Sequence, residues 1–436
     1  MSHPLGTNRT QVVSKGLESG VVVGIDPGLD RHGVVALVAG SCYPLARRMI
    51  ANRTAGMQFL AKLLSEWRAQ GADRLTIGIE EATAFGEALE CYLAQAGFKV
   101  VVVSPLKVAR FREAIGIDAN DLSDAEAIAR LLMVQPDLGQ APIREAVQAD
   151  QHGCEHRRLR QLARRHERWT REKTALCNEL HAVLRMAWLA DYQGFFSRVD
   201  GVAALTLWQT YPTPAEAVAA NPAELAGLIR KVTRGRINAP KSREKAKLIR
   251  STARFLTVAL GQRDANRWSA WAVDIRMLAK RLAELKADLK QLEQQMALVL
   301  EAIHSAARSF KGLGTVIAAR IHGETLSIHR FATADRFARY NGTAPREDSS
   351  GRRPRQVKNY RCNKRLKQAL MQLALTADRY HEESAKYLEH LRAKGITGGA
   401  ARLRLARRLS DIIYAMLKAN RAYDLDHHLK SRRSAA

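Results

Sequence analysis

The chain has 436 residues, 46% of them hydrophobic, so it can bury a sizeable core and should divide into two or three domains. It carries 70 Lys and Arg against 43 Asp and Glu, a formal net charge of +27. An excess of this size indicates a polyanionic partner. The apolar runs are too short to cross a bilayer, and we expect neither a signal peptide nor a membrane-spanning segment.

The positive charge is unevenly distributed. Residues 1–135 contain 14 basic and 14 acidic side chains, whereas residues 136–436 contain 56 and 29 and therefore hold the whole excess. A neutral domain with many carboxylates suits divalent cations, and a basic remainder suits phosphates. The five cysteines form no Cys-x-x-Cys pair, which predicts a reduced, cytoplasmic compartment.

The amino-terminal region reads as an α/β domain over residues 18–137, after a disordered segment at residues 1–17. Apolar runs bounded by turn residues predict strands, and longer amphipathic stretches predict helices. The expected strands are residues 21–25, 33–38, 43–50, 75–80 and 99–103, and the expected helices are residues 55–70, 85–96 and those after Pro105 and Asp121. The order β-β-β-α-β-α-β-α is that of an RNase H-like fold.

Residues 138–305 are predicted to be a helical, coiled-coil region. Apolar residues from Ile275 to Ile303 alternate three and four apart over four heptads, and residues 150–190 repeat the pattern less regularly. An antiparallel pair of long helices is the simplest arrangement, used either for self-association or for packing inside one chain. Between them, near residues 195–265, we expect a small basic helical insert that binds nucleic acid through Arg234 and Arg236.

Residues 306–428 are predicted to be a third, mostly α-helical domain, followed by a basic tail at 429–436. Gly312 and Gly314 open a predicted helix in the manner of a helix-hairpin-helix turn, whose backbone N–H groups can bind a DNA phosphate. A basic tract follows and is predicted to bind nucleic acid through Arg352, Arg353, Arg355, Lys358, Arg361, Lys364 and Arg365.

Four carboxylates are candidate catalytic residues. Asp26 and Glu80 each end an apolar strand, in Gly-Ile-Asp and Gly-Ile-Glu, and Asp121 and Asp124 lie three apart at a predicted helix start. Clustered carboxylates repel one another unless cations neutralise them, so this set predicts two magnesium ions, for which manganese can substitute. The alternative for Asp121 or Asp124 alone is a helix N-cap, and Glu81 is the alternative to Glu80.

These motifs resemble those of a known family over roughly residues 20–425. Gly24-Ile25-Asp26, Ile79-Glu80 and Asp121-x-x-Asp124-Ala125 resemble the DEDD, RuvC-like domain of the insertion-sequence one-ten family of transposases. The stretch from Gly312-Leu-Gly314 through Ser349-Ser350-Gly351 to Leu370 is similar to the carboxyl-terminal transposase domain of that family. Glu81, Asn120 and Cys362 depart from the family pattern, and the first of these leaves the choice of glutamate open.

The resemblance implies a mechanism and partners that the residues alone do not give. It implies Ser350 as nucleophile and a bridge RNA that pairs with donor and target DNA. Self-association through the coiled coil predicts a dimer or tetramer, which we expect in the prokaryotic cytoplasm, associated with the nucleoid. The expected function is magnesium-dependent cleavage and exchange of DNA strands by a transposase. The alternative enzymatic function is that of a site-specific invertase or a Holliday-junction nuclease of the same fold. The alternative without catalysis is a repressor that binds nucleic acid.

Overall fold

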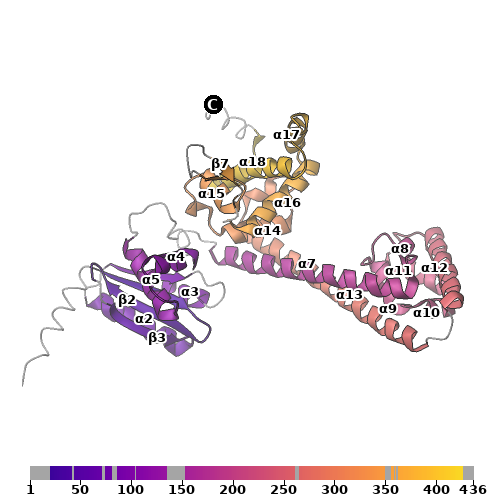
Figure 1. The fold of residues 1–436 in the computed structure, drawn as a ribbon, viewed down its shortest axis with the longest axis horizontal. Coiled ribbons are helices and arrows are strands. Elements are labelled where there is room, and N and C mark those ends of the chain that lie inside the picture. Colours follow the sequence, from indigo (N-terminus) through magenta and orange to yellow (C-terminus); the bar gives the residue numbers. More distant parts are fainter. Residues whose placement is uncertain are drawn as a thin grey trace, which may run out of the picture. The chain divides into compact units, whose positions relative to one another are not determined.

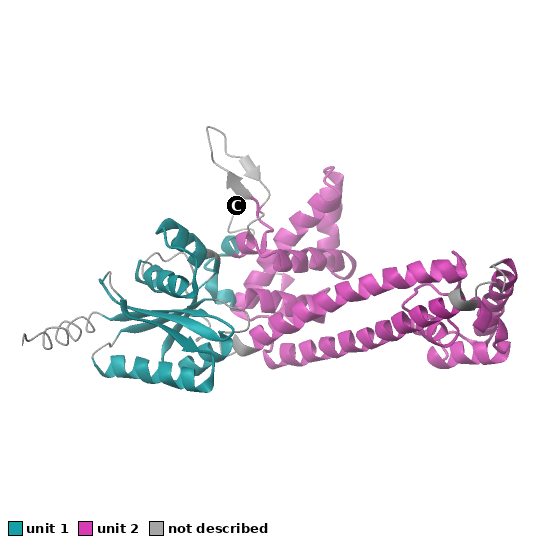
Figure 2. Ribbon diagram, turned by 60° about the horizontal axis from the view of Figure 1, so that its bottom comes forward, with its two compact units in different colours: residues 1–153, 327–336 teal, residues 154–326, 337–436 magenta. Residues whose placement is uncertain are grey.

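The computed structural model describes residues 20–41, 44–70, 74–80, 86–103, 105–134, 153–260, 265–348, 355–357, 359 and 362–425. The chain divides into two compact units (Figure 2). The first unit comprises residues 1–153 with 327–336, and the second comprises residues 154–326 with 337–436. Within the described ranges, no helix combines the length and the apolar character needed to cross a membrane.

The first unit contains a mixed sheet of five strands (Figure 1). The strands are β1 (Val21–Pro27), β2 (Arg31–Val38), β3 (Pro44–Ala51), β4 (Leu75–Glu80) and β5 (Lys99–Val103). Their order is β3-β2-β1-β4-β5, with antiparallel pairs β1–β2 and β2–β3 and parallel pairs β1–β4 and β4–β5. The predicted RNase H-like core is therefore confirmed, with two parallel strands ending side by side.

Helices cover both faces of this sheet. They are α2 (Thr54–Ala69), α3 (Glu87–Gln95), α4 (Pro105–Ala114) and α5 (Asp121–Val134). Strand alternation directs Val23 and Ile25 into a core with Leu60 of α2 and Leu89 of α3. The intervening residues of β1 face α5, so Asp26 lies on the face that α5 covers.

Glycines allow α5 to lie directly on the strands. A Cβ atom at Gly24 would lie 1.9 Å from the carbonyl oxygen of Ala125, and one at Gly33 would lie 2.3 Å from the carbonyl oxygen of Asp121. Gly78, which is opposite Gly24 in the parallel register, also faces α5. Since Gly24 and Gly33 meet the backbone of α5 directly, the start of α5 comes close to the end of β1.

Replacing Gly24 with Ala is therefore expected to displace α5 and to lower the free energy of unfolding by about 1–3 kcal/mol. The displacement should also separate Asp121 from Asp26. Urea unfolding measures the loss of stability. Gly227→Ala, inside α11 (Pro222–Val232) with nothing within 4 Å of the added Cβ, is the control: it should not lower the free energy of unfolding and is expected to raise it by up to about 1 kcal/mol. Wild-type stability in Gly24→Ala would contradict this account of the glycine face.

The second unit contains two long antiparallel helices, α7 (Gly153–Trp188) and α13 (Ala265–Ala302). Cross-helix contacts run in opposite order along the two helices: His166 contacts Glu293, and Glu172 pairs with Arg281. Apolar seam residues from both helices pack into one core, namely Leu180, Leu184, Ile275, Ala279 and Leu282. This supports the internal-packing alternative for the seam, while a coiled-coil geometry remains a prediction.

A helical insert lies at one end of this pair, and the carboxyl-terminal helices lie at the other (Figure 1). The insert comprises α8 (Tyr192–Phe195), α9 (Val202–Thr210), α10 (Pro214–Ala219), α11 and α12 (Ala239–Leu260). Its core centres on Trp188, Phe195 and Trp208, whose rings meet edge to face or at a tilt. The segment in which we expected a helical insert is thus a packed helical body.

The remaining elements are η2 (Ala306–Ser309), α14 (Thr315–Thr325), η3 (Ile328–Arg330), α15 (Ala334–Asn341), β6 (Arg346–Asp348), β7 (Arg355–Val357), α16 (Lys364–Tyr380), α17 (Glu382–Ala393) and α18 (Gly398–Ala419). A short 3-10 helix, η2, precedes the Gly312 turn. The φ angle of Gly312 is +97°, and a Cβ there would lie 3.2 Å from the backbone nitrogen of Ala377. These facts explain the glycine by packing, and a helix-hairpin-helix turn remains a prediction.

Candidate carboxylate site and nucleic-acid interface

Asp26 and Glu80 lie together at the ends of β1 and β4. Ile25 is opposite Ile79 in the parallel register, so the acidic residues that follow emerge side by side. Glu80 is on the same face as Gly78 and therefore faces α5, as Asp26 does. The two half-buried side chains share a hydrogen bond. Glu81 lies outside the described residues.

Asp121 and Asp124 lie in the first turn of α5. The cap of this helix is Asn120, whose Oδ1 accepts a hydrogen bond of 2.9 Å from the backbone N–H of Ser123. Neither aspartate is therefore needed as the N-cap, the alternative role that the sequence left open. Gly33, which packs against the backbone of Asp121, is opposite Asp26 in the antiparallel register, so this turn lies beside the strand ends.

The carboxylates perturb one another electrostatically. Burial, and after it the negative charges of Asp26 and Asp124, together raise the pKa of Glu80 to about 7. Burial also raises the pKa of Asp26, with added contributions from Asp124 and Asp121. Because the two carboxyl groups share a hydrogen bond and both pKa values are raised, the pair retains a proton to a higher pH than isolated carboxyl groups do. A divalent cation would neutralise the charge of the ionised pair.

Sequence reasoning did not identify Arg112, which belongs to this site. Its Nη1 atom on α4 lies 2.5 Å from Oδ1 of Asp124. A basic residue on an amphipathic helix is usually a solvated side chain, so nothing in the sequence around Arg112 distinguishes it from Arg110. The contact arises because α4 packs against α5.

The donor chemistry of these residues fits a hard divalent cation, since all four candidate ligands are carboxylates. Their present arrangement is not an assembled metal centre: among the residues that the structure describes, no three His, Cys, Asp or Glu side chains form a group that could hold a metal ion. Instead Asp26 pairs with Glu80, and Asp124 pairs with Arg112.

In the absence of metal, the free energy of unfolding is expected to fall as the pH rises from about 5 to about 8. A carboxyl group whose pKa is raised on folding contributes its full stability below its ordinary pKa of 4.5, and this contribution is lost as the pH rises through about 7. Glu80→Gln should flatten the profile, and chemical denaturation in EDTA measures it. Glu113→Gln, an exposed change on α4, should keep the wild-type slope. An identical slope in Glu80→Gln would contradict the assignment.

The predicted nucleic-acid-binding residues are only partly within the described structure. Arg234 and Arg236 follow α11 and are exposed, as is Lys364 at the start of α16. Outside the described residues lie the side chain of the candidate nucleophile Ser350 and those of five other nucleic-acid-binding candidates, namely Arg352, Arg353, Arg355, Lys358 and Arg361. Of these, only Arg355 has a described backbone, in β7.

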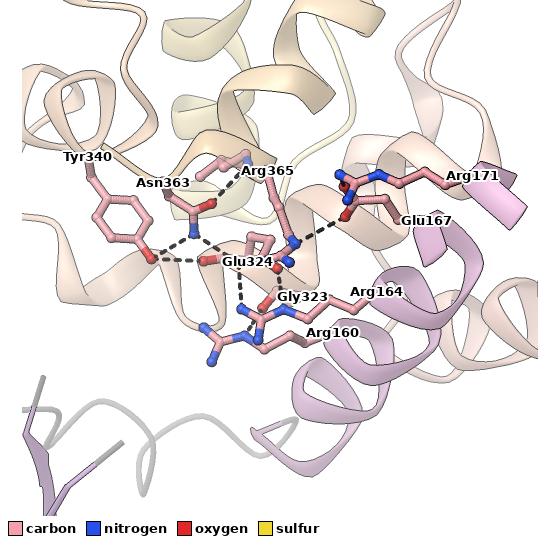
Figure 3. A network of polar contacts seen from close by, with 10 residues as sticks. Arg160, Arg164, Glu167, Arg171, Gly323, Glu324, Tyr340, Asn363 and Arg365 are labelled. Atoms are coloured by element: carbon pink, nitrogen blue, oxygen red, sulfur yellow. Dashed lines mark hydrogen bonds and ion pairs between the residues drawn. The ribbon is translucent and has the colours of Figure 1, made fainter. Parts of the chain in front are cut away.

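Arg365 is held by other side chains of the second unit. Its Nε atom lies 3.0 Å from Oε2 of Glu167, which also pairs with Arg171 (Figure 3). In the same network Glu324, whose side chain is only 2% exposed, pairs with Arg164 and accepts a hydrogen bond from Asn363. Arg365 thus has a structural partner at its Nε atom, and its contact with nucleic acid remains a prediction.

An RNase H-like core with acidic residues at two parallel strand ends and one helix start defines the DEDD class of transposases and nucleases. Residues 23–188 match the family DEDD_Tnp_IS110, described as "Transposase", and residues 304–389 match the family described as "Transposase IS116/IS110/IS902 family". The chain therefore matches, in order, two domain families of IS110-type transposases, the insertion-sequence one-ten family whose motifs it resembles.

Two proteins of Streptomyces coelicolor are similar in sequence. The "Mini-circle putative transposase for IS117" is 26% identical over 411 residues, which cover 93% of this chain and 95% of that protein. The "Insertion element IS110 uncharacterized 43.6 kDa protein" is 31% identical over 150 residues, which cover 34% of this chain and 37% of that protein. Among solved structures, Thermus thermophilus RuvC aligns with 27% of this chain and 97% of its own, at 18% identity and a TM-score of 0.22.

Proposed function

We propose that this chain is a magnesium-dependent DNA recombinase that cleaves and exchanges strands between an insertion sequence and its target. The observation that carries the proposal is the meeting of Asp26 and Glu80 at adjacent strand ends, beside the first turn of α5, within the segment that matches DEDD transposases. The basic charge of residues 136–436 supports a nucleic-acid substrate.

In this proposal Asp26, Glu80, Asp121 and Asp124 hold the divalent cations through carboxylate oxygens. The bound cations would activate the attacking oxygen and stabilise the leaving oxygen of a phosphodiester. The protein fixes the spacing of its ligands through rigid elements, since β1 and β4 share a backbone register and α5 lies on the sheet at Gly24 and Gly33.

We assign the nucleophile to Ser350, which lies in the segment matching the second transposase family. The chain places it between β6 and β7, which pair as a hairpin with Arg346 opposite Val357. Its hydroxyl oxygen would attack phosphorus to form a serine–DNA phosphodiester, and the departing DNA oxygen would take up a proton. The high pKa of a free hydroxyl requires activation, for which the carboxylate-bound cations are the source in this proposal.

We further propose that a bridge RNA selects the donor and target DNA by base pairing. The basic helical remainder would then hold RNA through backbone and shape contacts. A structured transcript encoded beside the gene, copurifying with the protein and required for recombination, would support this part. Recombination by RNA-free protein would remove the RNA from the reaction and leave the carboxylate chemistry intact.

A test of the central proposal is to incubate the full chain with end-labelled element DNA and with Mg²⁺ or EDTA. Strand cleavage only with Mg²⁺, accompanied by a protein–DNA adduct that survives denaturation, is expected. Cleavage without an adduct would indicate a nuclease that uses water. Salt-sensitive DNA binding without cleavage in any divalent metal would instead favour a repressor.

The double variant Arg234→Gln, Arg236→Gln is expected to bind nucleic acid more weakly, with a loss that is uniform across sequences. If each side chain contacts one phosphate, the slope of log affinity against log salt should decrease by about 2. Fluorescence anisotropy at several salt concentrations measures the slope. Arg281→Gln removes a charge from the same unit at an arginine already paired with Glu172, and it should change the slope little. Equal slopes in both variants would exclude Arg234 and Arg236 from the interface.

A further inference from the structure

A positively charged side chain, that of Arg112, lies among the candidate metal ligands. Arg112 and Asp124 form an ion pair of 2.5 Å, with side chains that are only 18% and 22% exposed. Solvent and salt therefore screen this pair less than they screen a surface ion pair. The charge of Arg112 also acts on Glu80, whose raised pKa it partly offsets. Arg112 thus neutralises the same group of carboxylates to which we assign metal binding.

The carboxylates occur as two separate pairs. Asp26 is hydrogen-bonded to Glu80, while Asp124 is bonded to Arg112. The pairs are close, because Gly33, which is opposite Asp26 on the neighbouring strand, packs against the backbone of Asp121 in the first turn of α5. Even so, within the described part of the chain no three such side chains form a group that could hold a metal ion. Arg112 occupies Oδ1 of Asp124, so this oxygen is not available to a cation in the present arrangement.

We infer that Arg112 holds Asp124 out of the metal site, and that a divalent cation binds only by displacing this guanidinium. The inference rests on the proposed function, in which Asp124 is a metal ligand. An oxygen that accepts a short charge-assisted hydrogen bond is a poorer ligand while that bond lasts. The guanidinium and the cation also repel each other, with little water between them to screen the repulsion.

The ion pair has a function in the chain without metal. Asp26 and Glu80 limit their repulsion by retaining a proton, and Asp124 limits its own by pairing with Arg112. The folded core therefore avoids four uncompensated negative charges at one edge of the sheet. Arg112 acts through Asp124 and is a positioning residue, which sets the concentration of metal at which the site assembles.

Mn²⁺ binding to the full chain without nucleic acid tests this inference. The signal of the free ion in electron paramagnetic resonance measures the affinity. Arg112→Gln should bind Mn²⁺ about tenfold more tightly than the wild type, because no guanidinium has to be displaced. Arg112→Lys keeps the positive charge and should lie between the two. Arg110→Gln removes an exposed charge from the same helix, and its affinity should stay within about twofold of the wild type.

Unchanged or weaker Mn²⁺ affinity in a folded Arg112→Gln variant would overturn the inference. A second measurement uses only the wild-type chain: modification of Arg112 by phenylglyoxal, followed by mass spectrometry, should increase when Mn²⁺ is added, and an unchanged or reduced rate would also overturn it. The proposed function fails separately. If the double variant Asp26→Asn, Glu80→Gln binds Mn²⁺ as the wild type does, the carboxylates are not the metal site.

Discussion

Replacing Asp26 with Asn is expected to reduce DNA strand cleavage about a thousandfold or more, a loss of about 4 kcal/mol of transition-state stabilisation. Asp26 sits between its hydrogen-bonded neighbour Glu80 and the first turn of α5, so it is the carboxylate that can share cations with every other member of the group. Glu80→Gln, Asp121→Asn and Asp124→Asn should cause losses of the same kind. Cleavage of labelled element DNA in saturating Mg²⁺ measures them.

DNA binding should survive these changes, because the whole excess of positive charge lies outside residues 1–135. Asp118→Asn is the matched control: it removes an exposed carboxylate just before α5 and should leave cleavage unchanged. Glu81→Gln tests the choice of glutamate. If that variant loses activity and Glu80→Gln retains it, our assignment of Glu80 is wrong, whatever the effect of Asp26→Asn.

The sequence predicted the sheet accurately where local pattern determines structure. The expected strands 75–80 and 99–103 coincide with β4 and β5, because short β-branched runs bounded by turn residues have few alternatives. The hairpin of β6 and β7 was not predicted. Its strands have three residues each and carry charged side chains, so they show neither an apolar run nor an alternating pattern.

Tertiary contacts between helices were harder to predict than the helices and strands themselves. The heptad pattern of α13 predicted an apolar stripe, but it did not show which part of the protein would pack against that stripe. In the structure, Ile275 and Leu282 of α13 pack against Leu180 of α7 in the same chain. His166 and Lys173 interrupt the matching stripe of α7. In the structure, His166 contacts Glu293 and Lys173 pairs with Asp200. These two polar residues, which interrupt the apolar pattern, therefore still contribute to tertiary contacts.

In the candidate site, too, the features set by local sequence were predictable and those set by tertiary packing were not. Spacing alone identified the four carboxylates, because strand ends and a helix start have fixed positions in an α/β fold. The glycine face that brings them together could also have been found, since Gly24 and Gly78 each precede a carboxylate by two residues. The contact of Arg112 with Asp124 could not have been predicted from the sequence, because it depends on the packing of α4 against α5 and no local sequence pattern indicates it.

The second large effect is expected at Ser350. Ser350→Ala should bind DNA and metal normally but form no covalent protein–DNA adduct, because the hydroxyl oxygen that would be esterified is absent. Denaturing electrophoresis of labelled DNA with wild-type and variant protein measures the adduct. Ser349→Ala removes the neighbouring hydroxyl and is the control, with wild-type adduct formation expected. Wild-type cleavage by Ser350→Ala would remove this serine from the mechanism and leave a nuclease that uses water.

Mixing variants tests whether the serine and the carboxylates must come from the same chain. Ser350→Ala chains carry intact carboxylates, and Asp26→Asn chains carry an intact serine, so each variant lacks what the other supplies. If the reacting groups act across an oligomer, an equimolar mixture should regain part of the wild-type recombination while each variant alone stays inactive. Inactivity of the mixture, with both variants bound to the same DNA, would require the serine and carboxylates of a single chain to act together.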